Sequence, residues 1–106
     1  MTETLLWEAW EDYNAVTGCK TIYVLGEMEM QGERLTPVLR KKELPGLSPT
    51  NLVLEIVSGT NKTRKQVEEL IYTEEICDQK FYDMITVFLG NKVIAEITEL
   101  EKIAIA

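Results

Sequence analysis

The strongest hydrophobic pattern in the chain consists of two apolar runs at residues 81–98, separated by Gly90-Asn91. Both turn residues tolerate the positive φ that a two-residue hairpin turn requires, so we expect a β-hairpin here. The first run has few polar residues on either face, which is typical of a strand inside a sheet. The expected partners across the turn are Leu89 with Lys92 and Val87 with Ile94.

Two other segments have apolar residues at helical spacing. Residues 4–17 place one apolar face along an amphipathic helix that Gly18 would end, and this face includes Ala9 and Trp10. Trp7 does not fit this face and falls on the polar side or its margin. Residues 63–75 begin with a capping box, and their apolar spacing favours a short helix over a strand.

The remaining elements are predicted as strands. Residues 20–31 alternate with period two and end at a glycine turn, after which residues 34–44 read as the returning strand of a second hairpin. Pro37 removes a backbone donor, which places the returning strand at an edge or makes it bulged. Residues 51–57 form a further strand, and residues 100–106 either extend the last hairpin or add a terminal strand.

These elements predict an α+β fold with the order α-βββ-α-ββ. An N-terminal helix and a short second helix would pack on a mainly antiparallel five-stranded sheet. The chain has 106 residues, which fits a single domain over residues 1–106. Neither a signal peptide nor an apolar run that could span a bilayer is recognised, so we expect a cytoplasmic location. In that compartment Cys19 and Cys77 are expected to be reduced, buried thiols, with a disulfide as the alternative.

The net charge of −7 argues against binding to nucleic acid or to anionic lipid. Seven of the eleven basic residues are nevertheless clustered in two short segments, at residues 34–42 and 62–65. The second cluster would lie at the start of the expected helix 63–75, where Thr63, Arg64 and Lys65 could bind an anion. The match to a phosphate-binding loop is poor, because Ile56 and Asn61 stand where glycines are needed.

The sequence contains no histidine, which removes the common nucleophilic triads and most transition-metal sites. Carboxylates alone remain as candidates for acid–base chemistry. Glu27 and Glu29 share one strand face and read as ordinary surface. Glu55 and Asp83 lie within apolar runs, and each is either buried or facing water beside a base on the next strand. We therefore expect no catalytic site, no metal site and no cofactor.

Two surfaces remain as candidate partner-binding sites. The first is Trp7, because exposed tryptophan is enriched at binding hot spots, although packing beneath a loop is an equal alternative. The second is a basic stripe, which could equally protect an edge strand from pairing with other chains. The stripe consists of Arg34, Arg40, Lys41 and Lys42.

These patterns favour a non-enzymatic protein that binds another protein or itself, with a homodimer as one form. Two alternatives stay open. One is a small-molecule or enzymatic pocket between helix and sheet, with Glu55, Asp83 or Tyr23 as its polar groups. The other is an acidic nucleic-acid mimic or immunity-type inhibitor, for which the acids should form a contiguous patch.

Overall fold

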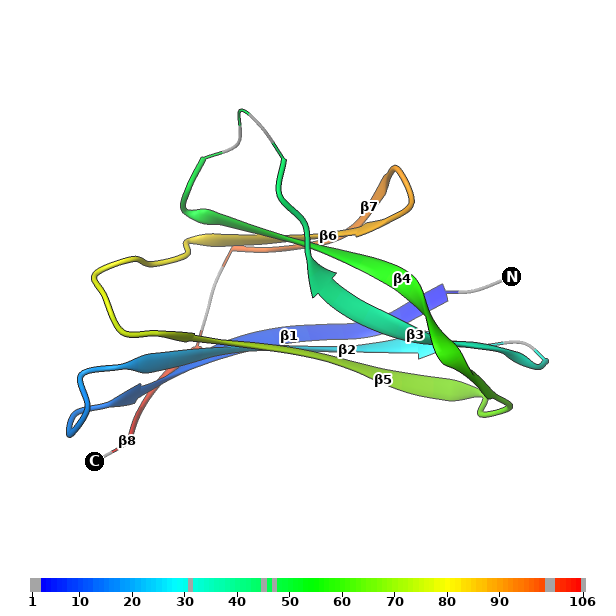
Figure 1. The fold of residues 1–106 in the computed structure, drawn as a ribbon, viewed down its shortest axis with the longest axis horizontal. Coiled ribbons are helices and arrows are strands. Elements are labelled where there is room, and N and C mark those ends of the chain that lie inside the picture. The colour runs from blue at the N-terminus through cyan, green and yellow to red at the C-terminus, as the bar shows by residue number, and fades with distance from the viewer. Residues whose placement is uncertain (1–2, 31, 45, 47, 99–100, 106) are drawn as a thin grey trace.

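Strands form every regular element of the computed structural model, which describes residues 3–30, 32–44, 46, 48–98 and 101–105. They build two sheets that face each other as two layers (Figure 1). The eight strands are β1 (Glu3–Asn14), β2 (Lys20–Glu29), β3 (Arg34–Lys41), β4 (Asn51–Thr63), β5 (Val67–Ile76), β6 (Met84–Leu89), β7 (Lys92–Ile97) and β8 (Glu101–Ile105).

Each sheet has four strands. Sheet A has the order β5-β2-β1-β8, and sheet B has the order β3-β4-β6-β7. Most neighbours are antiparallel, but β8 runs parallel to β1 and β6 runs parallel to β4. In the stacked arrangement β5 contacts β3, and β1 contacts β7. The chain passes from one sheet to the other after β2, β4, β5 and β7, so each sheet is assembled from separated parts of the sequence.

The predicted α+β fold is therefore wrong, because the described part of the chain contains no helix. The helix expected at residues 4–17 is instead strand β1, in which Ala9 and Glu11 face inward while Glu8 and Trp10 face outward. A register shift between Thr4 and Trp7 interrupts the alternation. Apolar residues on both sides of such a bulge mimic helical spacing, and this explains the misassignment.

The helix expected at residues 63–75 is also wrong, because this segment is largely β5. Its inward positions alternate between apolar and polar residues, so Leu70 and Ile76 are buried together with the partly buried Glu74. Polar side chains at inward positions hid the two-residue period in the sequence. They are tolerated because their oxygens have hydrogen-bond partners, as described below.

The hairpin at Gly90-Asn91 is confirmed, with Gly90 at φ 63° and Leu89 facing Lys92. The second expected pair is wrong, since an irregularity after Val87 places this residue opposite Ala95 instead of Ile94. Strand β6 lies between β4 and β7, so its predicted place inside a sheet is confirmed.

The second predicted hairpin is wrong, although both of its strands exist. β2 pairs with β1 and β5, whereas β3 belongs to the other sheet and pairs with β4. The prediction for Pro37 is confirmed, because β3 is an edge strand with a register shift between Leu35 and Pro37.

The strand predicted at 51–57 is β4, which continues to Thr63. Segment 100–106 contributes β8; Leu100 and Ala106 lie outside the described residues.

The core lies between the two sheets. Its fully buried side chains come from both layers: Ile22 and Val24 from β2, Leu70 from β5, Leu52 and Leu54 from β4, and Ile85 and Val87 from β6. Burying a side chain of this size stabilises a fold by about 1.5–3 kcal/mol. The inward faces are therefore committed to packing, and a partner can reach only the outward faces, the edges and the ends.

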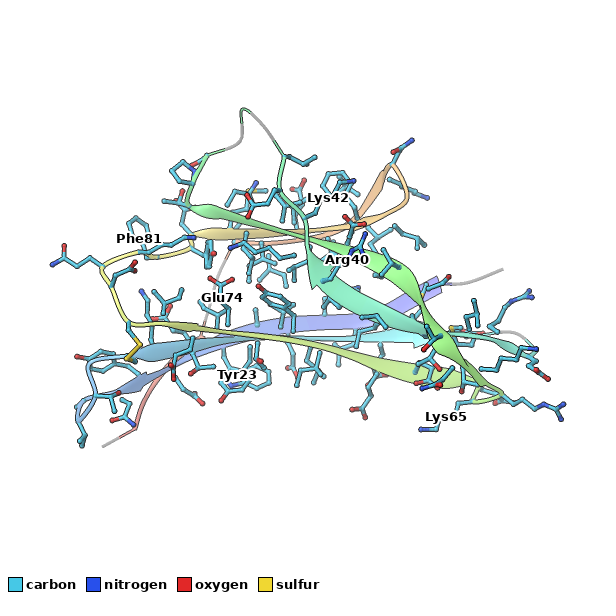
Figure 2. The ribbon with its side chains drawn as sticks, in the orientation of Figure 1. Tyr23, Arg40, Lys42, Lys65, Glu74 and Phe81 are labelled. Atoms are coloured by element: carbon cyan, nitrogen blue, oxygen red, sulfur yellow. A yellow bond between two sulfur atoms is a disulfide. The ribbon has the colours of Figure 1, made fainter. Side chains whose placement is uncertain are left out.

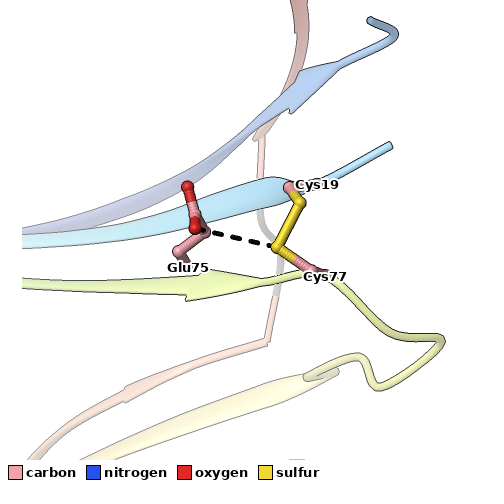
Figure 3. Close-up of side chains that lie close together, drawn as sticks. All are labelled: Cys19, Glu75 and Cys77. Atoms are coloured by element: carbon pink, nitrogen blue, oxygen red, sulfur yellow. Dashed lines mark hydrogen bonds between the residues drawn. A yellow bond between two sulfur atoms is a disulfide. The ribbon is translucent and has the colours of Figure 1, made fainter. Parts of the chain in front are cut away.

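Cys19 and Cys77 form a disulfide that joins the start of β2 to the end of β5 (Figure 3). The expectation of two reduced, buried thiols is wrong, because the cysteines face each other across adjacent strands and Cys77 is exposed. A carboxylate oxygen of Glu75 lies 3.7 Å from Cys77 Sγ. A disulfide sulfur has no proton to donate, so this approach is a contact only.

Candidate functional site

Trp7, the first candidate partner-binding residue, is not on the outer surface. It faces Gly26 across the β1–β2 ladder, is half-buried and packs against the core cluster. A Cβ atom added at Gly26 would lie 2.4 Å from Trp7 Cζ3, so the indole occupies the space that the glycine leaves. The indole therefore packs against a strand and not beneath a loop, and its role as a partner contact stays a prediction.

The basic stripe does not form one surface. Arg40 is exposed and lies 3.2 Å from Glu55, while Lys42 lies over the ring of Phe88 at 5.6 Å. Lys41 lies 3.4 Å from a carboxylate oxygen of Glu74 on the other sheet. Arg34 stands apart at the far end of the strand, where it lines a groove. Figure 2 shows Arg40 and Lys42 on the layer opposite Tyr23.

The carboxylates considered for acid–base chemistry are also separated. Glu55 is half-buried beside Arg40, which matches the alternative of a strand-face acid paired with a base on the next strand. Asp83 is exposed in the segment before β6. The anion site predicted at a helix N-terminus is absent from the described residues, because no helix begins at Thr63. Lys62 and Arg64 instead pair with Glu33.

A partly buried polar network connects the two layers. Tyr72 and Tyr82 donate hydrogen bonds to the two carboxylate oxygens of Glu74, at 2.7 and 2.8 Å, and Lys41 donates to the hydroxyl of Tyr82 at 3.1 Å. Glu74 lies between the layers in Figure 2. Because each of these groups is satisfied by the others, the network ties β5 to β3 and to the segment before β6.

The network shifts the pKa values of its members. Burial alone would raise the pKa of Glu74, but the hydrogen bonds from the two tyrosines and the charge of Lys41 outweigh burial and hold this pKa below its ordinary value. The pKa of Tyr72 is raised by burial and by its hydrogen bond to Glu74. The pKa of Lys41 is raised by its hydrogen bond to Tyr82, against the opposing effect of burial.

The outward face of sheet A combines aromatic, aliphatic and acidic side chains in rows across three strands. The central row is Trp10, Tyr23 and Thr73, and the next row is Glu8, Leu25 and Ile71. Trp10 and Tyr23 stack with ring centroids 5.2 Å apart and planes 10° apart, and both are half-buried. Ile71 is 59% exposed. In Figure 2 Tyr23 points away from the opposite layer.

Among the residues with described side chains, five further carboxylates surround these rows, and with Glu8 they make six; we call the whole surface the acidic face. No lysine or arginine occupies an outward position of β1, β2 or β5 among the residues with described side chains. Glu27 lies directly opposite Glu69 in the ladder, which places two like charges side by side. The six carboxylates are Glu8, Asp12, Glu27, Glu29, Glu69 and Glu75.

A polar hollow of about 240 Å³ adjoins the stacked rings, and Asp12, Thr21, Tyr23 and Glu75 contribute to its lining. The Oδ1 atom of Asp12 is buried and has no hydrogen-bond partner among the described residues. Leaving a buried acceptor unsatisfied costs about 1–3 kcal/mol, more if it is charged.

Sequence reasoning missed this surface because it assigned Trp10 to the packing face of a helix. The useful signal was the alternation of Glu8, Trp10 and Asp12 with Ala9 and Glu11, which has the two-residue period of a strand. The face exists only when β1, β2 and β5 lie side by side, and their pairing could not be read from the sequence.

The fold and this surface define a two-layer β-sandwich with one acidic, aromatic face. A scan against protein-family models, a search of curated proteins and a search of solved structures each gave no match. In the described part of the chain, no helix has the length and apolar character needed to cross a membrane.

Proposed function

We propose that this protein is a non-catalytic binding module whose acidic face binds a basic surface of another protein. The observation that supports this most directly is the stacked Trp10–Tyr23 pair, half-buried at the centre of a face with six described carboxylates. Aromatic residues with accessible surface are enriched among binding hot spots, and the surrounding charge defines which partners are attracted.

Charge complementarity distinguishes between the candidate partners. A second copy docked through the same face would bring two sets of carboxylates together, and a nucleic acid or an anionic lipid surface would be repelled in the same way. A partner rich in lysine or arginine would be attracted to this face. Self-association therefore ranks below a basic partner for this surface.

Arginine fits the chemistry of the face better than lysine does. Its planar guanidinium can stack on aromatic rings and can donate two parallel hydrogen bonds to a carboxylate. Tyr23 and Asp12 line the same hollow, so one guanidinium inserted there could stack on the ring and pair with the carboxylate.

The acids on this face repel one another and so lower the stability of the isolated domain. This loss of stability supports a binding role. Like charges that face each other across a ladder, as Glu27 and Glu69 do, destabilise a sheet by about 0.2–1 kcal/mol. A cationic partner would relieve this repulsion, so the cost to folding is offset in the complex.

The test is a charge reversal on the acidic face, Glu69→Lys, with nona-arginine as the probe peptide and isothermal titration calorimetry as the measurement. The new lysine would attract Glu27, so we expect the free energy of unfolding to rise by about 0.5–1 kcal/mol. The affinity for the peptide should fall by about tenfold, because the reversed charge now repels it.

The matched control is Glu96→Lys, which makes the same charge change at an exposed position of β7 in sheet B. Trp10→Leu adds a test of the aromatic pair, and it should remove any preference for nona-arginine over nona-lysine. Equal losses of affinity in Glu69→Lys and Glu96→Lys would show attraction by net charge alone and would overturn the proposal.

An acidic nucleic-acid mimic or immunity-type inhibitor is the second candidate. Its supporting observation is the set of acids, without a described lysine or arginine, at the outward positions of β1, β2 and β5, although rows of aromatic and aliphatic residues divide these acids. It would use the same face, but its partner would be a protein that normally binds nucleic acid. If duplex DNA and this protein compete for the same site on such a partner, the mimic hypothesis is supported over binding to basic proteins in general.

The disulfide bears on where binding would take place. Disulfides persist in oxidising compartments and are rare in the cytosol. The cytoplasmic location stays a prediction, and the Cys19–Cys77 bond favours an oxidising compartment in its place.

A further inference from the structure

A groove at one end of the sandwich lies between the two sheets and is separate from the acidic face. Its volume is about 540 Å³, within the range of roughly 300–1,000 Å³ found for small-molecule sites. Both layers contribute to its lining, with Met28 from sheet A and Leu35, Ile56 and Leu89 from sheet B.

An interruption in the β3–β4 ladder adjoins this groove. Leu35 pairs with Lys62, but Pro37 pairs with Ser58, so one residue of β3 spans three residues of β4. All four of these residues line the groove. Bulges of this kind redirect side chains at the ends of sheets, and the sheet here does not close over the core.

The floor of the groove is apolar and adaptable. Met28, Met30 and Ile56 have exposed fractions of only 4–6% and form part of the core cluster, while Leu35 near the mouth is 43% exposed. Methionine side chains are flexible and polarisable, so they can adjust to an inserted apolar chain.

The mouth of the groove is basic, in contrast to the rest of this acidic protein. Arg34 and Lys62 line it together with one acid, Glu33. Glu33 is engaged by two bases at once, at 3.5 Å from Lys62 and 3.0 Å from Arg64. Arg34 is exposed and makes no ion pair among the described residues. The mouth therefore has net positive charge beside an apolar floor.

From these features we infer that the groove binds a free amphiphile with one apolar chain and an anionic head group, of the fatty-acid class. The chain would lie against Met28, Met30 and Ile56, and the head group would pair with Arg34 and Lys62. Charge complementarity excludes a cationic amphiphile of the same length. The inference does not depend on the acidic face, because the two sites share no residue.

The test uses decanoate as the probe, below its micelle concentration, with the methionine methyl groups labelled for NMR. Met28 and Met30 line the groove and Met84 does not, so Met84 is an internal control. We expect decanoate to shift the signals of Met28 and Met30 and to leave that of Met84 in place. Decyltrimethylammonium, with a similar chain and the opposite charge, should bind about tenfold more weakly.

The variant Arg34→Glu places an acid at the mouth without touching the core, and it should weaken decanoate binding by about tenfold. Lys80→Glu makes the same charge change in the segment between β5 and β6 and should leave the affinity unchanged.

The inference is overturned if the methyl signals of Met28 and Met30 do not move, or if both amphiphiles bind equally. It is also overturned if these signals shift with protein concentration alone, which would make a second copy the occupant, or if only anionic vesicles shift them.

Discussion

At the scale of single residues, Gly26 and Trp7 explain each other. A glycine in the middle of a strand weakens the strand, because glycine loses more backbone entropy on folding than other residues and has no side chain to pack. Here the indole of Trp7 lies in the space that a side chain would take. The sequence showed a tryptophan that did not fit a helix, but the glycine that receives it lies on another strand.

Gly26→Ala should therefore destabilise the protein. The added Cβ would approach three atoms of the Trp7 ring at 2.4–2.6 Å, and overpacking of this kind costs about 1–3 kcal/mol of unfolding free energy. Urea unfolding measures the change. In the background of Trp7→Leu the same substitution should cost much less, and equal costs in both backgrounds would contradict the proposed contact.

Glu74 gives the fold a dependence on pH. Its pKa in the folded state is below the ordinary value, so its contribution to stability is complete above the ordinary glutamate pKa and is lost as the pH falls through the folded-state pKa. Glu74→Gln should lower the free energy of unfolding by about 1–3 kcal/mol at neutral pH. The difference from the parent protein should shrink in acid.

Urea unfolding at a series of pH values measures this effect, with the exposed Glu96→Gln as the control. A difference between Glu74→Gln and the parent protein that stays constant from neutral to acidic pH would show that the charge of Glu74 does not matter.

At the scale of elements, the sequence predicted those strands whose inward positions are all apolar. β2, β4 and β6 alternate clearly or are apolar over most of their length, and the pattern predicts all three, as it does β3 and β7 beside their turns. β1 and β5 were taken for helices, because β1 has a bulge and β5 has polar residues at inward positions. The polar positions of β5 became intelligible only when Tyr82 and Lys41, from distant segments, were seen to be their partners.

The disulfide acts at this scale, because it ties two neighbouring strands of sheet A. The bridged residues are separated by 58 positions, and in the chain-entropy model a loop of this size contributes about 4 kcal/mol to stability. The double variant Cys19→Ser with Cys77→Ser should lower the free energy of unfolding by about 2–4 kcal/mol.

Urea unfolding with and without dithiothreitol tests this prediction. The reductant should destabilise the parent protein to a similar extent and should leave the double variant unchanged. A parent protein that is insensitive to the reductant, with free thiols detected after unfolding, would refute the bridge.

At the scale of the whole molecule, both candidate sites depend on how the strands are distributed between the sheets. The acidic face needs β1, β2 and β5 side by side, and the groove needs β2 opposite β3, β4 and β6. Local patterns define strands but not their neighbours, because pairing between distant segments is decided by the packing of the whole core. This is why Arg34 was found from the sequence as a basic residue, but its groove was not.

The parallel pairing of β8 with β1 has a consequence for synthesis in the cell. Sheet A joins β1 to β8, which follows all the other described strands, and sheet B depends on β7. During synthesis, sheet B is not complete before Ile97 has left the ribosomal exit tunnel, and sheet A is not complete before Ile105 has left it. Until then the nascent chain keeps apolar strands unpaired, and such unpaired segments are prone to aggregation.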